Sequence, residues 1–157
     1  MSLIYSYAQV SMRRPIHPLG GRMTRPRALI EVGMIGRLAT KPYQGLLDTG
    51  ADDTVFPESA AELLGIDLTN APTGEATGVG MVPTPIRYAL VNLRISDGRE
   101  FCDWPAWVGF TAVPLRRPLL GYAGFLQFFD ATFRGGREEV ELVANPFYPG
   151  RSGLLVP

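Results

Sequence analysis

Leu46-Leu47-Asp48-Thr49-Gly50-Ala51-Asp52-Asp53-Thr54-Val55 is the stretch of sequence that says most about the fold. Two apolar residues lead into an acid, a hydroxyl and a glycine, a pattern typical of a strand that ends in a tight turn. Gly50 permits the turn, and the side chains of Asp48 and Thr49 can hydrogen-bond backbone groups that the turn leaves unpaired. The stretch therefore places a carboxylate at the end of a strand. Such a turn can also be purely structural, so the rest of the chain has to decide its role.

The length and charge of the chain indicate one globular domain with no bias toward polyanions. Its 157 residues suit a single domain with a substantial core. Fifteen Lys and Arg balance fifteen Asp and Glu, and fourteen of the fifteen cations are Arg scattered along the sequence. We therefore expect neither a nucleic-acid partner nor binding to an anionic membrane.

Cys102 and His17 are the only cysteine and histidine in the sequence. A single cysteine cannot form an intrachain disulfide, and the pair cannot supply a metal cluster, so we expect no metal and no cofactor. Catalysis by a Cys-His or Ser-His pair would have to use His17, which lies in a Pro-flanked stretch near the N-terminus. A buried neutral thiol is the expected state of Cys102.

The sequence has no run of about 18 apolar residues that could cross a membrane. Its first residues lack a basic start followed by a continuous apolar run, so no signal peptide is evident. The default expectation is a cytoplasmic protein.

Residues 1–27 are expected to form an N-terminal arm or strand. Residues 3–10 could be a strand, whereas the density of Pro and Gly over residues 13–21 favours a loop or arm over a core element. The regular part of the chain is therefore expected to begin near residue 28.

Strands and one short helix surround Asp48 in the next part of the sequence. Residues 28–35 read as a strand, and residues 43–47 as a second strand that leads into Asp48. A helix of about two turns is expected over residues 57–65, with Gly65 as its stop.

Two hairpins are expected after that helix. Glycines punctuate residues 73–81, and a strand from about residue 86 to 95 follows, which predicts an exposed hairpin with a pliant tip. Asp97-Gly98 is a strong two-residue hairpin signal that joins this strand to the next one.

The C-terminal part predicts a turn into a short buried helix over residues 119–129, although periodicity does not exclude a strand there. Residues 131–133 and 139–143 are expected to pair around Gly135-Gly136, before a Pro/Gly-rich tail over residues 145–157. Many short strands and two short helices predict a mostly-β domain built as a closed or partly closed barrel.

In this order, the features resemble the retroviral-type aspartic proteases, that is, the retropepsins and their cellular and bacterial relatives. The resemblance runs from about Ala28 to Phe133 and is most specific over residues 46–55. It implies a retropepsin-like closed barrel with a flap hairpin and one or two short helices, acting as a homodimer. The protease domain would then span residues 28–144, between the N-terminal arm and the C-terminal tail.

The resemblance also implies roles for individual residues. Asp48 would be the catalytic aspartate, Thr49 would brace the turn across a dimer, and Gly50 would lie close to the bound peptide backbone. An apolar-apolar-Gly element at residues 119–121 would pack behind the active-site loop. The implied substrate-binding residues are Ala51, Asp52 and Asp53 after the turn, and Gly78, Val79 and Gly80 at the flap tip.

The single Asp-Thr-Gly motif makes a prediction about assembly. Hydrolysis of a peptide by this route needs two adjacent carboxylates, one ionised to take a proton from water and one protonated to donate to the scissile carbonyl. Asp48 must therefore meet its own copy in a twofold dimer that binds an extended peptide or protein substrate.

The sequence departs from the family pattern at several positions. Tyr122 stands where the family often has an Arg that braces the acids after the catalytic turn. Either another cation does this for Asp52, with Arg87, Arg116 and Arg117 as candidates, or Asp52 faces solvent. Met81 lies beside the flap tip, and the extensions at both ends differ from the short termini of retroviral chains, so dimerisation could use a different surface.

Three functions remain open at this point. The first is a homodimeric aspartic endopeptidase. The second is a retropepsin-like module that binds peptides or dimerises without useful hydrolysis; the intact Asp-Thr-Gly motif speaks against it, whereas Tyr122 and the altered flap leave it open. The third is an unrelated β-barrel that binds small molecules and resembles the proteases only locally.

Overall fold

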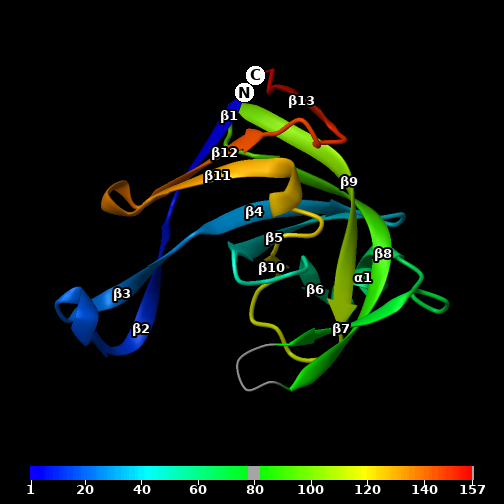
Figure 1. Cartoon of the computed structure of the whole chain (residues 1–157), viewed down its shortest axis with the longest axis horizontal. Helices are drawn as coiled ribbons and strands as arrows, with labels where there is room; N and C mark the ends of the chain where they lie inside the picture. Colours follow the sequence, from blue (N-terminus) through cyan, green and yellow to red (C-terminus); the bar gives the residue numbers. More distant parts are fainter. Residues whose placement is uncertain (78–81, 157) are drawn as a thin grey trace.

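The computed structural model describes residues 1–77 and 82–156, and these are mostly β (Figure 1). The described strands are β1 (Ser2–Ser6), β2 (Ala8–Ile16), β3 (Arg22–Arg27), β4 (Leu29–Ile35), β5 (Thr40–Leu47), β6 (Val55–Pro57), β7 (Thr73–Thr77), β8 (Pro83–Ser96), β9 (Glu100–Thr111), β10 (Leu119–Leu120), β11 (Phe129–Arg134), β12 (Glu139–Ala144) and β13 (Arg151–Leu154). The helical elements are α1 (Glu58–Leu64) and the 3-10 turns η1 (His17–Leu19), η2 (Leu126–Phe128) and η3 (Gly135–Arg137).

The main sheet contains eight strands in the order β13-β9-β6-β10-β5-β4-β8-β7. Because β9 also pairs with β8, the pairings that run from β9 through β6, β10, β5, β4 and β8 return to β9. β10 is parallel to β5 and antiparallel to β6, although it is only two residues long. This pairing brings the chain after β10 beside the loop that joins β5 to β6, which contains Asp48.

The hairpin of β8 and β9 forms as the Asp97-Gly98 pair predicts. The Asp97 carboxylate accepts hydrogen bonds from the backbone N–H groups of Arg99 and Glu100, at 2.9 and 3.0 Å. Gly98 has a φ of 89°, a conformation that glycine adopts at low cost. The turn therefore fixes the register of ten residue pairs, from Arg87 opposite Phe110 onward.

The core is built around Trp104 of β9, which is 1% exposed. Its ring packs edge-on against Phe125 and Phe129, with centroids 5.4 and 5.1 Å away, and its indole N–H donates to the Gly124 carbonyl at 3.0 Å. Cys102 on the same strand is buried, as expected. These contacts pack the segment after β10 against β9.

The helix predicted over residues 57–65 is confirmed as α1. Gly65 ends it in the left-handed region, at a φ of 70°, and its N–H donates to the carbonyls of Ala61 and Glu62.

The buried helix predicted over residues 119–129 is wrong, because this segment contains only β10 and the single 3-10 turn η2. Leu119 and Leu120 are held in the sheet by β5, and Gly124 has a φ of 88°, which interrupts any helix. No helix in the described residues has the length and apolarity of a membrane span.

The hairpin expected before residue 95 is present as β7 and β8, with pairs from Thr73 and Arg87 to Thr77 and Pro83. The tip that was expected at Gly78, Val79 and Gly80, and Met81 beside it, lies outside the described residues.

Both ends of the chain are joined to sheets. β1 pairs with β12, which also pairs with β11, as expected for the hairpin around Gly135-Gly136. β13 lies within the Pro/Gly-rich C-terminal segment and pairs with β9. Within residues 1–27, β2 and β3 form a hairpin in place of the expected loop, and η1 lies at its end.

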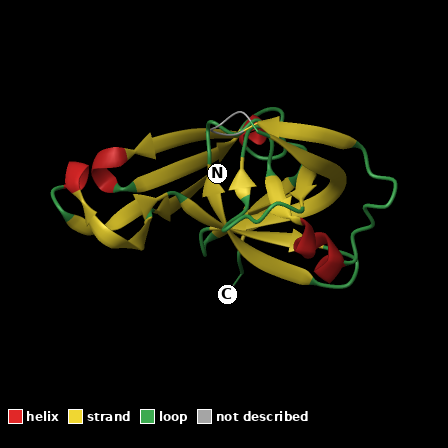
Figure 2. Cartoon of the chain, turned by 90° about the horizontal axis from the view of Figure 1, so that it is seen from below, coloured by secondary structure: helices red, strands yellow, loops and turns green. Residues whose placement is uncertain are grey.

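The β2–β3 and β11–β12 hairpins extend from the same side of the molecule (Figures 1 and 2). They are connected by the Glu138 carboxylate, which accepts hydrogen bonds from Arg22 at 2.9 Å and from Gln9 at 2.6 Å. The N-terminal hairpin is thus held in a defined position relative to the rest of the chain.

Candidate active site

The Asp48 side chain is half-buried at the end of β5, directly after the buried Leu47. Its backbone N–H donates to the Leu120 carbonyl at 3.1 Å. Its carboxylate Oδ1 accepts a hydrogen bond from the Gly50 N–H at 2.9 Å, and its carbonyl accepts one from the Ala51 N–H at 3.2 Å. These contacts form the side-chain-closed turn that the sequence predicts, and they fix one carboxylate oxygen. Thr49 and Gly50 are exposed beside it.

The loop after Asp48 rests on the backbone of the segment that follows β10. The Tyr122 N–H donates to the Ala51 carbonyl at 2.9 Å, and the Ala123 N–H donates to the Asp52 carbonyl at 2.8 Å. The Thr54 N–H donates in turn to the Ala123 carbonyl at 2.9 Å. The apolar-apolar-Gly element therefore packs behind the loop, as the resemblance implies.

Close packing against the loop explains why the apolar-apolar-Gly element ends in a glycine, Gly121. A Cβ atom at this position would lie 2.3 Å from the Asp53 carbonyl oxygen and 2.6 Å from the Ala51 carbonyl oxygen. Both neighbours are backbone atoms, so neither can move away without distorting the loop. The loop thus sits directly on the chain at Gly121.

Asp53 has a partner that sequence reasoning did not find. The Tyr88 hydroxyl on β8 donates to Asp53 Oδ2 at 3.1 Å. Burial, followed by the nearby Asp53 charge, raises the pKa of Tyr88 above its ordinary value. The two residues lie 35 positions apart, and no spacing pattern relates them, so only the packing of β8 beside the loop shows the contact.

Asp52 is exposed, and no ion pair to it exists within residues 1–77 and 82–156. Arg87, one candidate for the missing family Arg, forms an ion pair with Glu58 and donates to the Leu68 carbonyl at 3.3 Å. Tyr122 is 64% exposed and bonds to the loop only through its backbone N–H. Of the two alternatives for Asp52, the described residues favour the solvent-facing carboxylate.

Thr54, at the end of the loop, is buried in the core and hydrogen-bonds through its backbone. Its side chain is 0% exposed, and its hydroxyl has no hydrogen-bond partner among the described residues. Its carbonyl accepts the Gly109 N–H of β9 at 2.8 Å, so its backbone joins the loop to that strand.

The site residues expected from the sequence thus fall into two groups. Asp48 to Asp53 lie together in one loop, whereas Gly78, Val79 and Gly80 fall in the part of the chain that is not described. Among the described residues, no three His, Cys, Asp or Glu side chains are grouped so that they could hold a metal ion. Acid–base chemistry by a carboxylate is what this arrangement offers.

Comparisons with known proteins agree with this geometry. The family model described as "Aspartyl protease" matches residues 33–123, more than half of the chain, including β5, the loop and β10. A retropepsin-like aspartic protease from Rickettsia conorii shares the fold with a TM-score of 0.53, at 16% sequence identity and over 90% of each chain. No curated protein sequence matches. The chain therefore belongs to the aspartyl protease family, and its fold is that of the retropepsin-like aspartic proteases.

Proposed function

We propose that the protein is a homodimeric aspartic endopeptidase in which Asp48 and the Asp48 of a second copy form the catalytic pair. The observation that carries this proposal is the position of the Asp48 carboxylate. It lies at the end of β5, with one oxygen held by the Gly50 N–H at 2.9 Å and the backbone anchored to Leu120. One chain supplies one Asp-Thr-Gly motif, so a second copy has to complete the site.

In the proposed mechanism, the two carboxylates share one proton, because two adjacent negative charges repel each other, as is well known for aspartic proteases. The ionised carboxylate takes a proton from a water molecule, and the oxygen of that water attacks the scissile carbonyl carbon. The protonated carboxylate donates to the carbonyl oxygen, giving a tetrahedral intermediate. Proton transfer to the amide nitrogen then lets the C–N bond break, and the shared proton is restored.

The neighbouring residues support this chemistry in the proposed dimer. Thr49 braces the two turns against each other, and Gly50 leaves room for the substrate backbone. The circuit of paired strands acts as a retropepsin-like barrel, and the β7–β8 hairpin acts as a flap over an extended peptide. The residues proposed to line the substrate groove are Ala51, Asp52, Asp53, Gly78, Val79 and Gly80.

The test is cleavage of a mixed peptide library across a range of pH by the unaltered chain and by Asp48→Asn, with and without the hydroxyl-containing inhibitor pepstatin. Asp48→Asn is expected to abolish cleavage and to leave the sedimentation coefficient of the dimer unchanged. Asp130→Asn is the matched control, because Asp130 is an exposed acid on β11. Equal cleavage by the unaltered chain and Asp48→Asn would refute the assignment.

A second candidate is a peptide-binding or dimerisation module with little hydrolysis. It is favoured by Tyr122, which is exposed and leaves the acids after the turn without the expected guanidinium. The same library separates the two functions. A binding module would retain peptides equally in the unaltered chain and in Asp48→Asn, and neither would cleave them.

A further inference from the structure

A groove of about 850 Å³ opens beside the strand that leads to Asp48. Leu29, Leu46 and Leu119 are among the residues that line it, together with residues of β2 and of the loop before β10. Five arginines also line it, and no Asp or Glu does; they are Arg13, Arg14, Arg27, Arg116 and Arg117. We call this feature the arginine groove.

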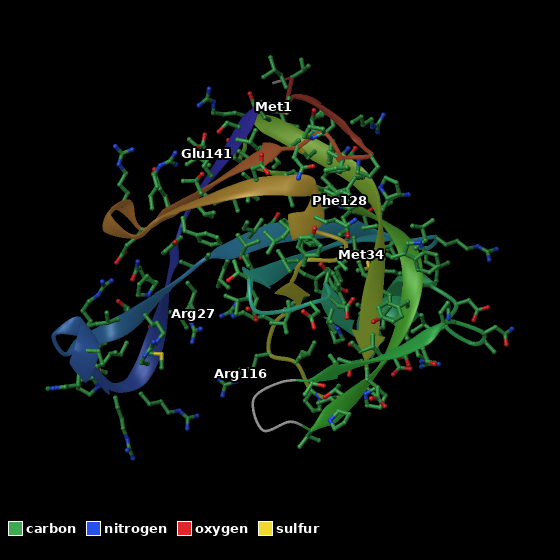
Figure 3. The ribbon with its side chains drawn as sticks, in the orientation of Figure 1. Met1, Arg27, Met34, Arg116, Phe128 and Glu141 are labelled. Atoms are coloured by element: carbon green, nitrogen blue, oxygen red, sulfur yellow. The ribbon has the colours of Figure 1, made fainter. Side chains whose placement is uncertain are left out.

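The arginines come from segments far apart in the sequence. Figure 3 labels Arg27, the last residue of β3, and Arg116, in the loop between β9 and β10. Arg13 and Arg14 belong to β2, so the N-terminal hairpin forms one wall of the groove. Five of the fourteen arginines are thereby brought to one groove, beside apolar residues, in a chain whose net charge is zero.

The guanidinium groups of the arginine groove have no acidic partner within residues 1–77 and 82–156. The ion pairs found there use other arginines, among them Arg22 with Glu138, Arg87 with Glu58, and Arg94 with Asp103. Several like charges around one groove repel each other unless an anion neutralises them. Arginine is well suited to binding an anion of this kind, because its planar guanidinium group binds a carboxylate through two parallel hydrogen bonds.

The groove is also next to the proposed catalytic residue. Leu46 lies in β5 and lines the groove, and Asp48 follows directly after that strand, two residues further on, which corresponds to about 7 Å along an extended chain. Leu119 pairs with Leu46, and the Asp48 N–H donates to the neighbouring Leu120. An extended peptide bound at Asp48 would need to span only a few residues to reach the arginine groove.

We propose that the arginine groove binds an acidic side chain of the peptide substrate, two to four residues from the scissile bond, so that the enzyme prefers to cleave near Glu or Asp. This inference rests on the proposed peptidase function. An acidic peptide fits better than a nucleic acid or an anionic membrane, because the arginines line one groove of limited volume together with leucines, while the chain as a whole is neutral.

The first experiment measures specificity. The full chain is given pairs of peptides that differ only in Glu or Gln at the second, third or fourth residue from a mapped cleavage site. At one of these positions the Glu peptide is expected to have a kcat/KM about tenfold higher. Arg116→Gln/Arg117→Gln is expected to remove this preference, so that this variant cleaves the Glu and Gln peptides with kcat/KM values within about twofold of each other.

The matched control is Arg37→Gln/Arg99→Gln, which removes two exposed arginines outside the groove and should keep the preference. Charge reversal by Arg116→Glu/Arg117→Glu should shift the preference toward Lys at the same position. Equal cleavage of the Glu and Gln peptides by the unaltered chain would overturn the inference, as would a preference that survives Arg116→Gln/Arg117→Gln.

A binding measurement keeps this test independent of catalysis. Fluorescently labelled Glu and Gln peptides are titrated with Asp48→Asn, alone and combined with the arginine substitutions, at two salt concentrations. Tighter binding of the Glu peptide that depends on Arg116 and Arg117 supports the groove even if the unaltered chain cleaves nothing, an outcome that would refute only the peptidase function. Equal binding of both peptides, or complete displacement by a short RNA of the same charge at the same concentration, would refute selective binding of an acidic peptide.

Discussion

Gly121 lies against the Asp53 carbonyl so closely that a Cβ atom would come within 2.3 Å of the carbonyl oxygen. The contact ties the loop that carries Asp48 to the segment after β10. We therefore expect Gly121→Ala to lower the free energy of unfolding by about 3 kcal/mol, because backbone has to move to make room for the methyl group. Urea denaturation followed by tryptophan fluorescence measures this change.

The control for this prediction is Gly136→Ala. A Cβ atom at Gly136 would meet nothing within 4 Å, so its free energy of unfolding should stay within about 0.5 kcal/mol of the unaltered chain. Equal effects of the two substitutions would show that Gly121 is not constrained by the loop.

Tyr88 holds the Asp53 carboxylate with its hydroxyl, at 3.1 Å. Tyr88→Phe keeps the ring and removes only the donor, so the free energy of unfolding should fall by about 1 kcal/mol. A double-mutant cycle with Asp53→Asn isolates the contact, and we expect a coupling energy of about 1 kcal/mol. Strictly additive effects of the two substitutions would mean that the hydrogen bond contributes nothing.

Thr54 buries a hydroxyl that has no hydrogen-bond partner among the described residues. Thr54→Val replaces this hydroxyl with a methyl group of similar size and should raise the free energy of unfolding by about 1 kcal/mol. Thr54→Ala instead leaves a cavity and should lower it by about 1 kcal/mol. Thermal unfolding of both variants tests the pair, and a destabilised Thr54→Val would indicate that the hydroxyl is hydrogen-bonded in solution.

Asp103 forms ion pairs with Arg94 and Arg151, and the Arg94 hydrogen bond in particular holds the pKa of the Asp103 carboxyl below its ordinary value. A lowered pKa in the folded state stabilises the protein above the pKa of the unfolded carboxyl, about 3.9, and this contribution is lost as the pH falls through the folded pKa. Asp103→Asn should therefore lower the free energy of unfolding by about 1 kcal/mol at pH 7.

The difference between Asp103→Asn and the unaltered chain should shrink progressively below about pH 4. Urea denaturation at pH 7 and at pH 3 measures it, with the exposed Asp130→Asn as the control. A difference that is the same at both pH values would show that the charge of Asp103 is not what stabilises the fold.

Short-range signals in the sequence determined much of the fold. Gly65 ends α1, Asp97-Gly98 joins β8 to β9, and Asp48 closes its own turn through Gly50. In each case the residues that decide the geometry are neighbours in the chain, so their backbone preferences and side-chain hydrogen bonds act before any distant contact forms. This is why residues 46–55 could predict a carboxylate at the end of a strand, whereas the family resemblance needed the order of features from about Ala28 to Phe133.

Contacts between distant segments decided the rest. The expected helix over residues 119–129 does not form, because Leu119 and Leu120 pair with β5 and Gly124 turns the chain in the left-handed region, with its backbone close to the Trp107 carbonyl oxygen. The Tyr88–Asp53 hydrogen bond and the arginine groove likewise join residues that no spacing pattern relates.

The sequence by itself determined where the carboxylate lies and how its turn closes, because those are local properties of the backbone. Only the tertiary structure decided what surrounds it, because strand pairing and burial bring together residues whose separation along the chain carries no signal.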